Sequence, residues 1–227
     1  VSLFKSSPDK GIKYFIDNLI IKDNTPEAIS NFLYSCQKLD KYQIGMFLTE
    51  STNFEYLNFF MKNYSFKNVK YIDEALRIFL AHLTLPKSET RIDILLTAFG
   101  NLYIHTRGRS DFSSSDAVIS FSKRILSYQS YSQRVDIIEQ NGLSSIISIE
   151  RPQFDSTMRP LHPTNYSAQP VPPFDKFVEI MDGINDGSSL SIEYLKQIHF
   201  NISTAPIILA PLDGDNVKIN DGNLGIN

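Results

Sequence analysis

The feature that most constrains this chain is a succession of short stretches in which apolar residues recur at helical spacing. Between Asp9 and Ile20 they fall on one helical face: Ile12, Phe15, Ile16, Leu19 and Ile20. Thr25 followed by Pro26 is a capping residue before a proline at the first helical position, a strong helix start. No stretch shows the alternation of a half-buried strand. The pattern predicts an all-α array in which short, neighbouring helices run antiparallel.

Composition narrows the class of protein further. The 227 residues, 42% of them hydrophobic, are enough for one sizeable core and predict one domain. A net charge of −3 gives no reason to expect nucleic acid as a partner. Cys36 is the only cysteine, which favours a reducing, cytosolic setting over a disulfide framework. No apolar run reaches the ~20 residues that a membrane-spanning helix needs. The chain begins at Val1, and we interpret it as a segment of a longer protein.

The sequence offers little support for metal, cofactor or nucleophile chemistry. The four histidines lie far apart without the spacing of metal ligands, so we expect no metal site. The chain has no Gly-x-x-x-x-Gly-Lys loop, so we expect no bound nucleotide and no cofactor. No Gly-x-Ser-x-Gly elbow is present for acyl transfer.

One stretch places a carboxylate on a corner between two expected helices. A helix over 72–83 is followed by Leu85-Pro86, and the residue before a proline is pushed out of the helical region. Ser88 is then a candidate cap, and Glu89 falls in the first turn of the next helix, where the helix dipole favours negative charge. The apolar stripe of that helix consists of Ile92, Leu95, Leu96 and Phe99.

This stretch resembles the first signature of the Sec-seven (Sec7) domain, the module that releases GDP from Arf-family GTPases. The signature contains Leu-Pro-Gly-Glu and then Ile-Asp. Leu85-Pro86 and Ile92-Asp93 match it in residue type and in spacing. Two departures matter: Lys87 stands where the family has glycine, and Ser88 stands where the family has its catalytic glutamate. Glu89 comes one position later.

Further segments resemble the same family in the same order along the chain. They are Lys10–Asn18, Leu39–Gly45 with Asp40 as a cap, Ile72–Leu80 and Asp182–Gly187. The resemblance implies a right-handed array of about ten short helices. It also implies an exchange domain over 1–202, followed by a linker or tail over 203–227.

The second signature of the family is interrupted in this chain. Ser115 is a candidate cap for a helix with Val118, Phe121 and Ile125 on its apolar face. Ile125-Leu126 is similar to the Met-Leu of the signature, whereas its Leu-His-Asn-Pro ending has only a late counterpart, Leu161-His162-Pro163. We therefore expect an insertion at about 127–157, with irregular structure continuing to 173.

The resemblance implies guanine-nucleotide exchange on an Arf-family small GTPase. Glu89 would be the catalytic acid that enters the phosphate and magnesium site of the partner. The groove that binds the GTPase would consist of Leu85, Ile92, Asp93, Leu96, Phe99, Phe121, Ile125 and Leu126. We expect peripheral membrane association through flanking domains, with the plasma membrane favoured, and no direct membrane insertion by this segment.

Two alternatives stay open. Glu89 can be simply an acid that the helix dipole favours, because that is the commonest reason for a carboxylate in a first turn. Apolar residues at helical spacing are most often core, so the groove residues can be structural. With Ser88 in place of the glutamate, the domain can also act as a binding or scaffold module with weakened exchange activity.

Overall fold

The computed structural model describes residues 1–107, 111–133 and 173–207, and within them the chain is entirely helical apart from turns and links. The ten helices of the described residues are α1 Ser2–Ser6, α2 Pro8–Asp17, α3 Pro26–Ser35, α4 Lys41–Leu48, α5 Phe54–Met61, α6 Ile72–Leu80, α7 Glu89–Arg107, α8 Ser115–Gln133, α9 Phe174–Met181 and α10 Ile192–Thr204. Among these residues an isolated bridge between Asn185 and Ser188 is the only strand-like pairing. The predicted all-α fold class is confirmed.

Side-chain caps explain where several helices begin. The Thr25 hydroxyl accepts a hydrogen bond from the Ala28 N–H at 3.2 Å, and the Asp40 carboxylate accepts one from the Gln43 N–H at 3.0 Å. Both caps were expected from the sequence. The cap of α8 is Ser114 instead of the expected Ser115, because the Ser114 hydroxyl accepts from the Ala117 N–H at 3.1 Å. Each such bond satisfies a backbone donor that has no partner within the helix.

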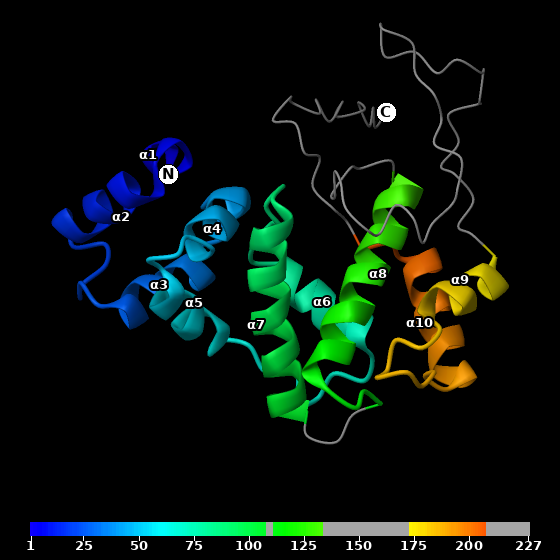
Figure 1. Ribbon diagram of the computed structural model, residues 1–227. Helices are drawn as coiled ribbons and strands as arrows, with labels where there is room; N and C mark the ends of the chain where they lie inside the picture. Colours follow the sequence, from blue (N-terminus) through cyan, green and yellow to red (C-terminus); the bar gives the residue numbers. More distant parts are fainter. Residues whose placement is uncertain (108–110, 134–172, 208–227) are drawn as a thin grey trace, which may run out of the picture.

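The two longest helices, α7 and α8, lie side by side in the middle of the molecule (Figure 1). Helices α1 to α5 gather on one side of α7, and α9 and α10 lie beyond α8 (Figure 1). Helix α6 lies behind the central pair and packs against α10. This arrangement makes α7 the element that joins the N-terminal half of the domain to the C-terminal half.

An aromatic cluster forms the core behind α7. The rings of Phe66, Phe79, Phe99 and Tyr103 are fully buried, and neighbouring ring centroids lie 5.3 to 6.1 Å apart. Edge-on and tilted contacts at such distances are favourable beyond the burial of area. Because α6 and α7 both contribute rings, the cluster fixes the position of α7 against the rest of the core.

Several boundaries differ from the sequence-based expectation. Helix α6 ends at Leu80, three residues before the expected end at 83. Helix α8 continues to Gln133, so the first residues of the expected insertion at 127–157 are helical. The remainder of that insertion, the later Leu161-His162-Pro163 and residues 208–227 of the expected tail lie outside the described residues.

Candidate functional site

The corner between α6 and α7 is held against α4. The Thr84 N–H donates a hydrogen bond to the Lys41 carbonyl oxygen at 3.0 Å. Gly45 of α4 lies so close to this link that a Cβ on it would be 2.3 Å from the Thr84 carbonyl oxygen. Leu85 and Pro86 are buried beneath the corner. The corner therefore has a fixed position instead of being a loosely attached loop.

Glu89 is the first residue of α7, and its side chain is partly exposed at this corner. The preceding Ser88 is exposed, and its carbonyl oxygen accepts the Ile92 N–H at 2.9 Å, which closes the first turn. Within the described part of the chain, no hydrogen bond or ion pair engages the Glu89 carboxylate. It lies where the positive end of the helix dipole favours it. Its catalytic role stays a prediction.

Arg91 ties the first turn of α7 to the end of α4. Its Nη1 atom donates to the Met46 carbonyl oxygen at 2.9 Å and to the Thr49 hydroxyl at 3.0 Å. Its Nη2 atom lies 2.7 Å from the Glu50 carboxylate. A guanidinium suits this role because it presents several donors in a rigid, planar fork. Arg91 thus anchors the first turn of α7 two residues after Glu89.

Most of the predicted groove residues belong to the core. Leu85 is 6% exposed, and the other apolar members of the set are at most 2% exposed: Ile92, Leu96, Phe99, Phe121, Ile125 and Leu126. Helices α7 and α8 cross closely, since a Cβ on Gly100 would lie 2.7 Å from Cγ1 of Ile119. In this structure these side chains support the two helices from within. Their contact with a partner stays a prediction, and it would need α7 and α8 to separate.

Asp93 is the predicted groove residue with an accessible side chain, 44% exposed. Its carboxylate pairs with the ammonium group of Lys123 at 2.5 Å, which joins α7 to α8. The sequence interpretation did not single out Lys123. The sequence signal for it was a basic residue on α8, the helix expected to lie beside the acid Asp93 of α7.

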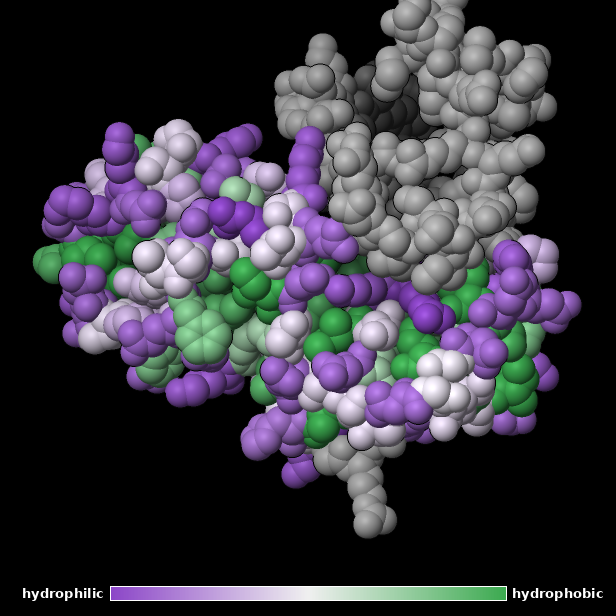
Figure 2. Space-filling view, viewed as in Figure 1, coloured by the Kyte–Doolittle hydropathy of each residue, from purple (hydrophilic) through white to green (hydrophobic). Residues whose placement is uncertain are grey.

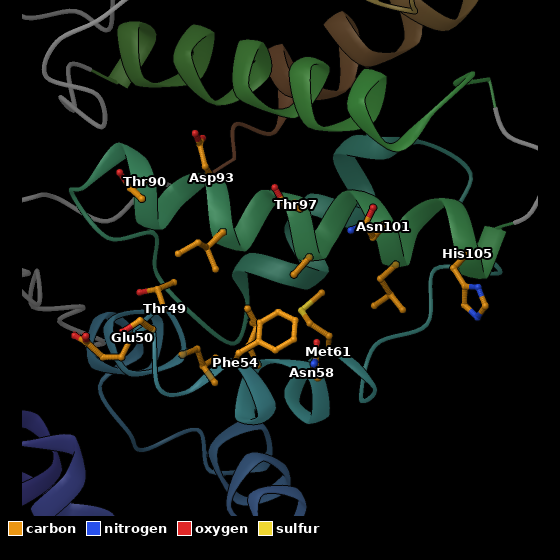
Figure 3. A pocket seen from close by; sticks show the side chains of 16 residues that line it. Thr49, Glu50, Phe54, Asn58, Met61, Thr90, Asp93, Thr97, Asn101 and His105 are labelled. Carbon is orange, nitrogen blue, oxygen red and sulfur yellow. The ribbon is translucent and has the colours of Figure 1, made fainter.

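A pocket of about 800 Å³ opens on the other side of α7, between α7 and the end of α4 with α5. Figure 2 shows hydrophobic residues gathered in the middle of this face, and Figure 3 shows the pocket between the helices. Its lining residues are Leu48, Thr49, Glu50, Ser51, Phe54, Leu57, Asn58, Met61, Thr90, Asp93, Ile94, Thr97, Ala98, Asn101, Leu102 and His105. Asp93 is the predicted groove residue that this pocket includes.

Phe54 differs in exposure from the other apolar residues that mark its helix in the sequence. It is 67% exposed, whereas Leu57, Phe60 and Met61 are at most 6% exposed. Phe54 is the first residue of α5, so no earlier turn of that helix lies over its ring. Figure 3 shows the ring directed into the space below α7.

The described residues contain neither a cluster of metal-ligating side chains nor a helix that could span a membrane. No group of three or more His, Cys, Asp and Glu side chains there is placed to hold a metal ion. No described helix combines the length and the apolar character needed to cross a bilayer.

The fold defines a class of all-helical domain built around two long central helices, α7 and α8 (Figure 1). The family model of the Sec7 domain matches residues 1–207, and the chain belongs to the Sec7 domain family. It is 32% identical over 209 residues to an uncharacterized protein of Schizosaccharomyces pombe, which covers 92% of this chain and 12% of that protein. It is 28% identical over 218 residues to human cytohesin-4, which covers 94% of this chain and 46% of cytohesin-4. The chain thus spans less than half of each relative.

Solved structures show the same fold. The Sec7p catalytic domain has a TM-score of 0.68 at 21% identity, covering 91% of this chain and 95% of that one. A Sec7 domain bound to ARF1-GDP and brefeldin A has a TM-score of 0.69 at 23% identity, covering 92% of this chain and 90% of that one.

Proposed function

We propose that this domain promotes the release of GDP from an Arf-family GTPase. Membership of the Sec7 family supports the proposal, as does the similar fold of a Sec7 domain that binds ARF1-GDP. The single observation that carries the residue assignment is Glu89, a partly exposed acid on a corner held in place by α4. In this proposal its carboxylate enters the nucleotide site of the GTPase.

Electrostatic repulsion gives such a carboxylate a large effect. Two unit charges 4 Å apart interact by about 4 kcal/mol at an effective dielectric constant of 20. Since ~1.36 kcal/mol corresponds to a tenfold change in rate, one carboxylate near the β-phosphate accounts for roughly three orders of magnitude in release. The same acid competes with the phosphate for the magnesium ion. Its loss should therefore be nearly disabling.

Glu89 lies one residue later than the glutamate of the family signature, whose position Ser88 occupies. One step along a helix turns a side chain by about 100° and raises it by ~1.5 Å, enough to miss a small target. Glu89 lies at the junction of the link and the helix, where the intrahelical bonds are incomplete. We propose that the link 81–88 is one residue longer than in the family and that α7 begins one residue later, which keeps the acid in the first turn of the helix.

An exchange assay with fluorescent GDP tests the proposal. The chain should accelerate GDP release from an Arf-family GTPase, and Glu89→Lys should lower the rate by about two to three orders of magnitude. Glu193→Lys is the matched control, because Glu193 is the exposed acid in the first turn of α10. It should retain the wild-type rate. Equal rates for the wild type and Glu89→Lys would remove Glu89 from the mechanism.

A second candidate function is that of a binding or scaffold module with weakened exchange. The exposed Ser88, at the position where the family has its glutamate, favours this candidate. The double variant Ser88→Glu, Glu89→Ser restores the family order of residues. A wild type that binds the nucleotide-free GTPase without accelerating release, together with activity gained by the double variant, would establish the scaffold function instead.

We propose further that any peripheral membrane association, with the plasma membrane favoured, comes from domains that flank this segment. The relatives extend well beyond the part that this chain matches, which leaves room for such domains. Comparing vesicle binding of this chain with that of the full-length protein tests the proposal, since only the longer protein should sediment with the vesicles.

A further inference from the structure

We propose that the pocket between α5 and α7 holds an apolar side chain of the GTPase, and that Phe54 is the anchor of this contact. This inference rests on the proposed exchange function and adds a second contact beyond the acid at the corner.

The exposure of Phe54 and the character of the walls indicate an apolar occupant. The ring is 67% exposed although it lines a pocket of about 800 Å³. Neighbouring walls are apolar and come from both helices: Leu57, Met61, Ile94, Ala98 and Leu102. A large aromatic ring gains from removal of its surface from water, and aromatic anchors in pockets commonly dominate the affinity of an interface.

The charged residues of the lining already have partners within the chain. Among the described residues that line the pocket, Glu50 and Asp93 are acids, and none is a lysine or an arginine. Each is held in place by an intramolecular cation, Glu50 by Arg91 and Asp93 by Lys123. The remaining edge offers hydroxyl and amide groups from Thr90, Thr97 and Asn101. This combination of apolar walls, paired acids and a polar edge fits an uncharged, apolar side chain.

Continuity with the proposed site identifies the occupant as the GTPase. Asp93, Thr97 and Asn101 follow Glu89 at intervals of four residues, so all four lie along one side of α7. At ~1.5 Å per residue this strip extends for about 18 Å. A partner that receives Glu89 in its nucleotide site therefore covers the mouth of the pocket as well.

Replacing Phe54 by alanine tests the anchor. With the GTPase as the varied substrate, Phe54→Ala should raise KM by at least about tenfold, while kcat changes by less than about threefold. Phe200→Ala is the matched control, because Phe200 is 60% exposed on α10 and belongs to no part of this pocket. Its kinetic constants should equal those of the wild type.

A tryptophan probe provides a readout that is independent of exchange. The chain contains no tryptophan, so Phe54→Trp introduces a single indole into the pocket. Phe200→Trp introduces a single indole on α10 instead. After subtraction of the spectrum obtained with the tryptophan-free wild type, nucleotide-free GTPase should shift the emission of Phe54→Trp to shorter wavelength. It should leave the emission of Phe200→Trp unchanged.

The outcomes separate the two proposals. An active wild type with equal KM values for Phe54→Ala and Phe200→Ala overturns the pocket assignment and leaves exchange intact. If the wild type does not accelerate exchange, but the GTPase shifts the emission of Phe54→Trp, the exchange proposal is overturned and the pocket assignment is supported.

Two further results would identify a different occupant of the pocket. Emission of Phe54→Trp that depends on dilution without GTPase would show a second copy of the chain in the pocket. Emission that changes when residues 208–227 are removed would show the chain's own tail there. Either result overturns the inference.

Discussion

Gly45 and Thr84 lie in direct backbone contact, although 38 residues separate them in the chain: a Cβ on Gly45 would be 2.3 Å from the Thr84 carbonyl oxygen. The hydrogen bond from the Thr84 N–H to the Lys41 carbonyl oxygen fixes the same link at 3.0 Å. The position of the acid at the start of α7 therefore depends on α4, a helix that is remote in sequence.

Gly45→Ala should displace this link. A methyl group cannot fit 2.3 Å from a backbone oxygen, so the link or α4 must move. We expect a loss of about 1–3 kcal/mol in the free energy of unfolding, measured with urea, and a fall in exchange rate larger than stability explains. Gly183→Ala is the control: its positive φ of 64° makes alanine unfavourable, but its Cβ would meet no atom within 4 Å. That variant should lose stability without losing exchange. Full activity of Gly45→Ala would show that the link tolerates displacement.

Arg91→Ala should loosen the first turn of α7. The change removes the hydrogen bonds to the Met46 carbonyl oxygen and the Thr49 hydroxyl together with the ion pair to Glu50. The expected cost is about 1–3 kcal/mol in urea unfolding, because the two buried or partly buried acceptors lose a charged donor. Arg91→Lys should recover only part of it, since one ammonium cannot reproduce the planar fork. Equal stability of the arginine and lysine forms would contradict this account.

Replacing Lys123 by glutamine should free the Asp93 carboxylate to contact the GTPase. The two groups are 2.5 Å apart and only partly buried, so Lys123→Gln should change stability by less than ~1 kcal/mol. If Asp93 contacts the GTPase, as the family resemblance implies, kcat/KM should rise several-fold in Lys123→Gln and fall in Asp93→Asn. Exchange rates measured at several salt concentrations check this. Identical rates for both variants and the wild type would exclude Asp93 from the contact.

Asp73 should make stability depend on pH. Its side chain is buried, accepts a hydrogen bond from Asn201 at 3.2 Å and lies 3.7 Å from Arg77. Burial raises the pKa of Asp73 despite these two contacts. Just above pH ~3.9, the ordinary pKa of an aspartate in an unfolded chain, the folded state keeps a proton that the unfolded state has lost. Stability from this group is present at low pH and is lost as pH rises through the raised pKa.

Asp73→Asn removes this titration while it keeps the shape and the oxygen acceptor. The free energy of unfolding of the wild type, relative to that of the variant, should fall as pH rises above about 3.9, the ordinary pKa of an aspartate. Urea unfolding at four pH values measures the difference. Asp17→Asn, at an exposed aspartate, controls for the loss of one charge. Parallel profiles for the wild type and Asp73→Asn would show that the burial of Asp73 has no consequence for titration.

Local patterns were sufficient for much of the fold. Apolar residues at helical spacing predicted the helices, and the capping chemistry of Thr25 and Asp40 predicted two of their starts, because these signals act within one turn of the chain. Boundaries were less accurate. The link 81–88 begins earlier than the proline pattern indicates, since the docking of Thr84 on α4 competes with continuation of α6.

The candidate site was predicted less completely than the fold. The spacing of Ile92, Leu96 and Phe99 marks one face of a helix, but it does not tell whether that face meets another helix or a partner. The structure places all three in the core. Phe54 and Lys123 were missed because their importance depends on what lies opposite them, on α7 in both cases.

The sequence by itself determined which segments are helical, where an acid enters the first turn of α7, and which family the chain resembles, because each of these is encoded in neighbouring residues. Tertiary structure alone decided which apolar faces are buried, that Arg91 and Gly45 hold the corner, and that a pocket opens between α5 and α7. These features arise where segments distant in the chain pack together, and the free energy of that packing is not a property of any one segment.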